Sequence, residues 1–260
     1  MGYEEKNKDE GISRVQENHI EGRNAVLEAF RSGKTIDKLY VLDGCQDGPV
    51  KSITREARKY DTIINYVSKE RLDQLSETGK HQGVIAVSAA YAYSEVEDML
   101  EAARAKGEAP FLFILDGIED PHNLGAIIRT ANLCGAHGVI IPKRRAVGLT
   151  PTVAKTSAGA INYTPVAKVT NISATIKELK EQGLWFVCAD MGGTSMYDLN
   201  LTGPIGLVIG NEGEGVSKLV KENCDMVASI PMKGDIDSLN ASVAAGVLAY
   251  EIVRQRITKG

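Results

Sequence analysis

The chain has 260 residues, 43% of them hydrophobic and 25% charged, which is ordinary for a soluble globular protein of one large domain or two modest ones. No apolar run approaches the roughly 18 residues of a membrane span, and the acidic start, MGYEEKNKDEG, does not resemble a secretory signal. Four cysteines and four histidines are scattered without the close pairs of zinc or redox sites. The composition therefore predicts a cytoplasmic protein without a metal site or a membrane anchor.

Residues 16–90 alternate between helical and strand patterns, behind a tail of residues 1–15 that we expect to be disordered. Helices are predicted over 24–30, 50–60 and 69–75, and strands over 38–42, 63–67 and 84–89. This alternation predicts a small three-layer α/β domain. Residues 91–109 are charged and prone to form a helix, and we interpret them as a semi-rigid connection between domains.

From residue 110 the alternation restarts with stronger apolar runs. Strands are predicted over 111–115, 138–141, 164–167, 185–189, 206–209 and 226–230. Helices are predicted over 123–134, 152–160, 172–182 and 239–256, with Gly183 ending the third. Because apolar strands alternate with helices, we expect a second α/β domain over 110–260, with a mostly parallel sheet covered on both faces.

The net charge of −4 hides an uneven distribution along the chain. Residues 121–177 contain no Asp or Glu but carry seven cations, namely Arg129, Lys143, Arg144, Arg145, Lys155, Lys168 and Lys177. Such a run can form a local positive surface that attracts phosphates. It is equally consistent with a solvated face.

Three polar or glycine-rich segments follow buried strands, where ligands collect in parallel α/β sheets. They are DGIEDPHNLGAIIR (116–129), GNEGEG (210–215) and IPMKGDIDSLNAS (230–242). The second lacks the lysine and hydroxyl of a P-loop and the spacing of a dinucleotide site, and its two glutamates would repel phosphate. It fits either a backbone collar around a cationic or neutral ligand or a tight turn that caps a helix.

The other two segments offer helix caps, together with polar residues that caps do not explain. Asn123 is a candidate N-cap for the helix that follows it, and Asp237 or Ser238 could cap the last helix. A single cap does not account for the three polar side chains at the start of the last helix, Ser238, Asn240 and Ser242, because the rest of that segment consists mainly of small apolar residues. Arg129 stands in an apolar turn, where a long cation either reaches water or meets an anion.

Taken together, NLGAIIRTA, LVIGNEGEG and IPMKGDIDSLNASVAAGV resemble the three motifs of the SpoU/TrmH group of SPOUT RNA methyltransferases. The segments HIEGRNAVLEAF and HQGVIA resemble the L30-like substrate-binding domain of that group, so the likeness covers nearly the whole chain. It implies a C-terminal domain with a deep trefoil knot, which periodicity alone could not reveal. It also implies methyl transfer from S-adenosylmethionine to the ribose 2′-oxygen of a guanosine in large-subunit (23S) rRNA.

The resemblance also implies roles for individual residues. Cofactor contacts are expected from Gly210, Ile230 and Leu239. The active-site positions of the family are occupied by Asn123, Arg129, Glu212, Ser238 and Asn240. From the acid-free stretch, we expect Lys143, Arg144, Arg145 and Lys155 to contact phosphates of the RNA.

The likeness favours Arg129 as the residue that acts on the ribose hydroxyl, yet a guanidinium has a pKa of roughly 12 or more and should stay charged. Arg129 therefore either loses its proton in a desolvated site or stabilises the developing alkoxide as a cation. We prefer the second account, with Glu212 and Asn240 orienting groups around the arginine.

A homodimer is also expected. The last helix carries an apolar stripe that is wider than contact with its own sheet usually needs, made of Leu239, Val243, Val247, Tyr250 and Val253. In the family that this sequence resembles, the dimer brings RNA on one subunit beside the cofactor of the other.

Three alternatives remain. An antibiotic-resistance rRNA methyltransferase would share the architecture and chemistry and differ only in its target nucleotide. A tRNA ribose methylase is disfavoured because such enzymes commonly lack a folded N-terminal domain of this kind. A protein that only binds RNA would be expected to have lost Arg129, Glu212 or Asn240, and all three are present.

Overall fold

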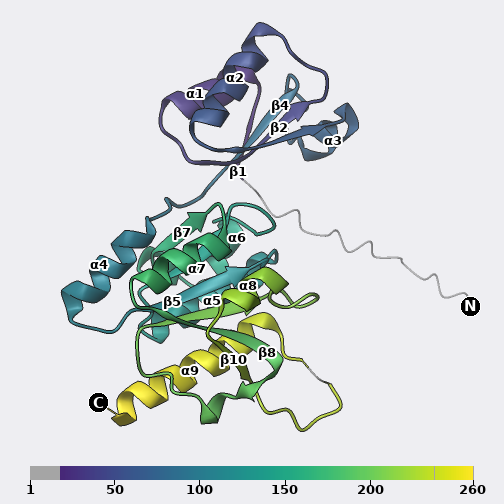
Figure 1. Cartoon of the computed structure of the whole chain (residues 1–260). Coiled ribbons are helices and arrows are strands. Elements are labelled where there is room, and N and C mark those ends of the chain that lie inside the picture. The colour runs from purple at the N-terminus through teal and green to yellow at the C-terminus, as the bar shows by residue number, and fades with distance from the viewer. Residues whose placement is uncertain (1–17, 237, 260) are drawn as a thin grey trace, which may run out of the picture.

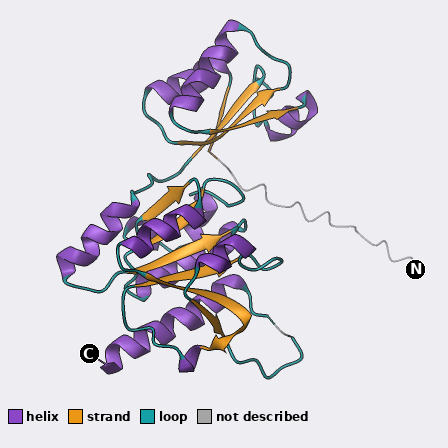
Figure 2. Cartoon of the chain, viewed as in Figure 1, coloured by secondary structure: helices purple, strands orange, loops and turns teal. Residues whose placement is uncertain are grey.

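The computed structural model describes residues 18–236 and 238–259 and has two α/β domains joined by one chain segment (Figure 1). The tail predicted for residues 1–15 and the candidate cap Asp237 lie outside the described residues. The expected fold class is confirmed, with a small N-terminal domain and a larger domain built on a parallel sheet (Figure 2).

The N-terminal domain contains a four-stranded mixed sheet in the order β1-β4-β2-β3. The strands are β1 (Asn18–Glu21), β2 (Ile36–Leu42), β3 (Ile63–Val67) and β4 (Val84–Ser88). The helices are α1 (Arg23–Arg31), α2 (Gly48–Lys59) and α3 (Lys69–Leu75). Sequence periodicity missed β1, a four-residue strand that pairs antiparallel with β4.

Helices cover both faces of this sheet. Val26 of α1 and Ile53 of α2 share a buried cluster with Ala86 of β4. Ile85, the neighbouring residue on β4, is also buried but points to the opposite face. There α3 packs against β2 and β4 and buries Leu72. The two faces therefore carry different helices, in the expected three layers.

The larger domain contains a six-stranded sheet in the order β10-β8-β9-β5-β6-β7, in which every neighbouring pair is parallel. Its strands are β5 (Phe111–Asp116), β6 (Gly138–Pro142), β7 (Val166–Val169), β8 (Trp185–Ser195), β9 (Ile205–Gly210) and β10 (Met226–Ser229). Its helices are α4 (Val96–Lys106), α5 (Pro121–Leu133), α6 (Pro151–Thr156), α7 (Ile172–Glu181), α8 (Lys218–Asn223) and α9 (Ala241–Lys259). The helix predicted over 152–160 ends at Thr156 and is followed by a separate 3₁₀ turn, Ala160–Asn162. Helix α8 was not predicted.

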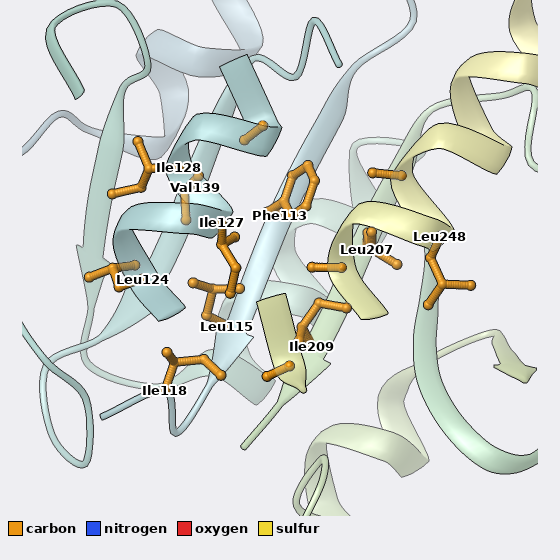
Figure 3. Packing of buried hydrophobic residues seen from close by; sticks show 14 of the residues in the cluster. Phe113, Leu115, Ile118, Leu124, Ile127, Ile128, Val139, Leu207, Ile209 and Leu248 are labelled. Carbon is orange, nitrogen blue, oxygen red and sulfur yellow. The ribbon is translucent and has the colours of Figure 1, made fainter. Parts of the chain in front are cut away.

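Two groups of helices cover the parallel sheet. On one face, Ile127 of α5 and Leu248 of α9 belong to one buried cluster with Phe113 of β5 and Ile209 of β9 (Figure 3). On the other face, Met99 of α4 belongs to a second buried cluster shared with α7 and α8. Most of the segment expected to connect the domains is therefore a helix packed on the large sheet.

A buried ion pair joins the domains. Lys168 Nζ of β7 lies 2.6 Å from Asp37 Oδ1 of β2, and the hydroxyl of Tyr93 donates to Asp37 Oδ2 over 3.1 Å. The two charged side chains are only 13% and 7% exposed. Burial lowers the pKa of Lys168 and raises the pKa of Tyr93. This contact fixes the N-terminal domain against the edge of the large sheet.

Replacing Lys168 by methionine should therefore loosen the docking of the two domains. The change leaves the buried carboxylate of Asp37 without its cation, at a cost of about 3 kcal/mol that separation of the domains would relieve. Small-angle scattering should report a larger radius of gyration. The matched control is Lys143→Met, because Lys143 pairs with Asp61, whose side chain is 69% exposed, and such pairs contribute less than about 1 kcal/mol. Equal scattering curves for the two variants would contradict this role of Lys168.

Candidate active site

The GNEGEG loop begins at the end of β9 and is closed by hydrogen bonds within the loop. The backbone N–H of Gly215 donates to the carbonyl oxygen of Asn211 over 3.0 Å. Asn211 Oδ1 accepts hydrogen bonds from the backbone N–H groups of Gly213 and Glu214, at 3.0 and 2.6 Å. A Cβ on Gly210 would lie 2.0 Å from the carbonyl carbon of Gly215, so only glycine permits this closure. The sequence predicted glycine here for close approach of a ligand, whereas the structure shows that the loop itself requires it. Asn211 was missed, although an Asn before Gly-rich residues is a known turn signal.

A cavity of about 410 Å³ lies beside this loop, at the carboxyl ends of β9 and β10 and against the middle of β8. Its lining includes all three residues expected to contact the cofactor, Gly210, Ile230 and Leu239. Ser238, Glu212 and Glu214 line it as well. We call it the cofactor cavity below, after the role that the sequence resemblance implies for those three residues.

A cluster of three polar side chains, from three segments distant in sequence, stands at the edge of this cavity. Asn123 Nδ2 donates to Glu212 Oε1 over 3.0 Å, and Asn240 Nδ2 donates to both Asn123 Oδ1 and Glu212 Oε1. Both amides therefore bind one oxygen of Glu212. The other oxygen, Oε2, has no hydrogen-bond donor among the described residues, so it can accept a bond from a ligand.

The structure corrects both predicted helix caps. Asp120, not Asn123, caps α5 by accepting from the backbone N–H of His122, and Asn123 is buried in the first turn. At α9, Asn240 Oδ1 accepts from the backbone N–H groups of Ser242 and Val243, which is the role predicted for Asp237 or Ser238. Asn240 thus caps its helix with one end of the amide and holds Glu212 with the other.

A second, larger cavity of about 960 Å³ lies across the GNEGEG loop from the first. Asn211–Gly215 line both cavities, so Glu212 stands in the wall between them. Asn123, Arg144 and Arg145 also face the larger cavity. At its rim, the carboxylate of Asp116 accepts from the backbone N–H of Ser217 over 2.8 Å, a contact that sequence reasoning did not identify.

The remaining predicted residues are dispersed. Arg129 is exposed on α5, lines neither cavity, and makes no hydrogen bond or ion pair with any residue in 18–236 or 238–259. Lys143 is engaged by Asp61. Lys155 is exposed on α6, away from the lining of both cavities. One protomer therefore brings together the carboxylate and amides of the expected site, but not its arginine.

Within the described ranges, no group of three or more His, Cys, Asp or Glu side chains could hold a metal ion. Among the same residues, no helix is long and apolar enough to cross a membrane.

Comparison with known proteins identifies the family. The model of the SpoU rRNA Methylase family matches residues 110–250, and a model described as RNA 2′-O ribose methyltransferase substrate binding matches residues 19–94. The chain belongs to the SpoU/TrmH family of RNA methyltransferases. YacO of Bacillus subtilis, described as a TrmH family tRNA/rRNA methyltransferase, is 49% identical over 243 residues, which cover 93% of this chain and 97% of YacO.

Solved structures of this family share the fold. The SpoU methyltransferase AviRb from Streptomyces viridochromogenes, in complex with AdoMet, is 26% identical with a TM-score of 0.57, over 97% of this chain and 95% of AviRb. The TrmH/SpoU tRNA modifying enzyme of A. aeolicus is 30% identical with a TM-score of 0.53, over 63% of this chain and 85% of its own.

The cofactor of this methyltransferase is S-adenosylmethionine, and the cofactor cavity suits it. Ile230, Met232 and Leu239 offer apolar surface for an adenine ring. Glu212 and Glu214 offer negative charge for the sulfonium and the amino group.

Changing Asn240 to alanine should reduce both stability and activity. The variant loses the cap of α9, a loss of about 1 kcal/mol that lowers the Tm by roughly 2–4 °C in a chain of this size. It also leaves Glu212 Oε1 with a single donor, the amide of Asn123, so kcat should fall further than for a stability effect alone. Asn240→Ser keeps a side-chain oxygen that can cap α9 but removes the amide donor, so it should retain the Tm and still lose activity. An Asn240→Ser enzyme with wild-type kcat would show that the bond to Glu212 has no catalytic role.

Proposed function

We propose that this methyltransferase acts on the ribose 2′-oxygen of a guanosine in large-subunit 23S rRNA, in the cytoplasm. The observation that carries the proposal is the position of Glu212, in the wall shared by the cofactor cavity and the larger cavity. A methyl donor on one side and a nucleotide on the other would meet at this carboxylate. In this arrangement, the deep trefoil knot of the family would hold the GNEGEG and 230–240 loops together.

The cofactor supplies an electrophilic methyl group on its sulfonium. The chain itself has to orient the ribose hydroxyl and stabilise the charge that its oxygen gains. Because Asn123 and Asn240 occupy Oε1 of Glu212, Oε2 remains free to accept the hydrogen bond of the 2′-hydroxyl. That bond would aim an oxygen lone pair at the methyl group, and Oε2 would take up the proton that the hydroxyl loses on methylation.

A cation near the oxygen is still needed, and the exposed position of Arg129 indicates how it is supplied. Thr130 of α5 lies against Gly246 of α9, so the two helices form one continuous surface. This surface exposes Leu133, Val243 and Tyr250, by 64%, 49% and 52%. An apolar surface of this kind beside an unpaired arginine is typical of a subunit interface. The homodimer would place Arg129 of one subunit at the Glu212 cluster of the other.

The dimer can be tested directly. Multi-angle light scattering at micromolar concentration should give twice the chain mass, and Val243→Glu should shift the protein to monomers because it buries a charge in the interface. Ile257→Glu, also on α9 and 76% exposed, is the control for a charge near the end of the helix. A monomeric wild type would overturn both the dimer and the arginine supplied in trans.

Guanosine is favoured by the carboxylates of the larger cavity. Asp116 and Asp120 are occupied by backbone N–H groups, whereas the side chains of Glu119 and Glu214 have no hydrogen bond or ion pair among the described residues. The Watson–Crick edge of guanine presents N1–H and N2–H₂ side by side, and a carboxylate can accept from both. RNA with inosine at the target lacks the N2 donor and should be methylated more slowly.

Large-subunit rRNA is favoured over tRNA by the extent of the matches. The match to the tRNA modifying enzyme of A. aeolicus covers 63% of this chain. The match to a solved structure whose description concerns 2-OH methylation of C/U34 on tRNA covers 58%. By contrast, the family model that matches residues 110–250 is described as SpoU rRNA Methylase, and a model for RNA substrate binding matches residues 19–94. An assay with methyl-labelled cofactor and purified 23S rRNA, 16S rRNA and tRNA should label 23S rRNA. Label in tRNA alone would refute the assignment.

A further inference from the structure

Three hollows form a continuous line from the N-terminal domain to the active site. The first, about 620 Å³, lies between α2 and β3, and the second, about 330 Å³, lies between the domains. Arg58 and Tyr66 line both of them. Arg144 and Thr170 line both the second hollow and the larger cavity of the active site. A linear polymer could therefore run through all three without leaving the surface.

Three cations without an acidic partner among the described residues line the first hollow. Lys51, Arg55 and Arg58 follow one another at spacings of four and three residues, so they share one face of α2. All three are exposed or partly exposed, and none makes a salt bridge with a residue in 18–236 or 238–259. By contrast, Lys59 on the same helix pairs with Glu56. Cations left without carboxylates along a hollow fit a polyanion.

An aromatic ring stands where the first two hollows meet. Tyr66 is 53% exposed on β3, the edge strand of its sheet, and makes no ring contact among the described residues. Bases of single-stranded nucleic acids stack on exposed aromatic rings of this kind, which lie beside cations that bind the phosphates. Paired bases in a duplex would not expose a face to it.

The charge along the line changes sign at the active site. In the lining of the first two hollows, cations outnumber carboxylates. The cations are Lys51, Arg55, Arg58, Lys143 and Arg144, and the carboxylates are Asp43 and Asp61. Asp61 is already paired with Lys143. The larger cavity carries Arg144 and Arg145 against five carboxylates, those of Asp116, Glu119, Asp120, Glu212 and Glu214. The approach therefore suits a phosphate backbone, and the end suits a neutral base.

We propose that an unpaired RNA strand lies along Lys51, Arg55, Arg58, Tyr66 and Arg144, the RNA track, and delivers its target nucleotide into the larger cavity. The inference rests on the proposed function, since it takes the larger cavity as the acceptor site. It specifies that the substrate is single-stranded next to the target and that its flanking nucleotides are bound by α2 and β3.

The test measures binding of a fluorescent, unstructured RNA of about 12 nucleotides to the full chain over a range of salt concentrations. Arg55→Gln/Arg58→Gln should flatten the plot of log affinity against log salt by about 1.4, which is roughly 0.7 for each phosphate that the variant no longer neutralises. The matched control is Lys69→Gln/Arg71→Gln on α3, which packs on the opposite face of the same sheet, and it should leave the slope unchanged. Tyr66→Ala should weaken binding about tenfold at every salt concentration. Calorimetry should show unchanged cofactor affinity for all variants, which verifies that they fold.

Equal salt slopes for the α2 and α3 variants would overturn the track. Wild-type affinity of Tyr66→Ala would refute a single strand at this position. The two proposals fail separately, because the track is measured by binding and the function by methyl transfer. Track variants that bind weakly while the wild type methylates no RNA would leave the track standing and refute the proposed function.

Discussion

Replacing Gly210 by valine is expected to weaken binding of S-adenosylmethionine by about 100-fold. The added side chain would start 2.0 Å from the carbonyl carbon of Gly215, so the GNEGEG loop could not close. Overpacking of this severity costs roughly 3 kcal/mol, and here the loop is the part that would yield. Because the loop lines both cavities, the change should also reduce RNA methylation at saturating cofactor.

Isothermal titration calorimetry measures the first effect. The control is Gly213→Ala in the same loop, where a Cβ would have only Asn211 Oδ1 within 4 Å, at 3.7 Å, and should be tolerated. Normal cofactor affinity of Gly210→Val would mean that the cofactor binds elsewhere and that the 410 Å³ cavity has another role.

Replacing Arg129 by alanine is expected to lower kcat by about 10²–10³-fold while RNA and cofactor still bind. This is the usual effect of removing one group that stabilises charge developing on a reacting oxygen. Arg129→Lys keeps the cation but loses the planar guanidinium, so it should retain partial activity if charge stabilisation is its role. If deprotonated arginine acted as a base, the lysine variant would have a shifted pH profile. Near wild-type activity of Arg129→Ala would refute both accounts.

The proposed contribution of Arg129 across the dimer can be tested separately, by mixing two variants. Arg129→Ala and Glu212→Gln should each be inactive, but in mixed dimers one of the two sites would contain both wild-type residues. An equal mixture that exchanges subunits should therefore recover about a quarter of wild-type activity. No recovery in dimers shown to have exchanged would mean that Arg129 serves its own subunit.

The fold could be predicted largely from local patterns, because the buried strands are continuous apolar runs. Phe111–Asp116 and Ile205–Gly210 pair side by side in the centre of the sheet, as expected of strands covered on both faces. Two short elements were missed, namely β1 (NHIE) and α8 (KLVKEN), because their one and two apolar residues form no recognisable pattern.

The site could be predicted only in part. Three motifs identified Asn123, Glu212 and Asn240, but sequence spacing could not show that two amides converge on one carboxylate oxygen. The caps were misassigned because several residues near each helix start can accept from the backbone. For α5 a cue was present, since Pro121 favours the first helical position and makes Asp120 the cap. In the dimer that we propose, Arg129 would act on a second subunit, so the structure of one chain does not bring it to the Glu212 cluster.

We expect this methyltransferase to modify the ribose 2′-oxygen of one guanosine in 23S rRNA. The most direct measurement maps 2′-O-methyl groups across the ribosomal RNA and tRNA of cells with and without the gene, and of deleted cells that express the wild type or Glu212→Gln. One 23S guanosine should lose its 2′-O-methyl group on deletion and regain it only with the wild type. Identical 23S maps, with the missing methyl group in tRNA or on a base, would contradict it.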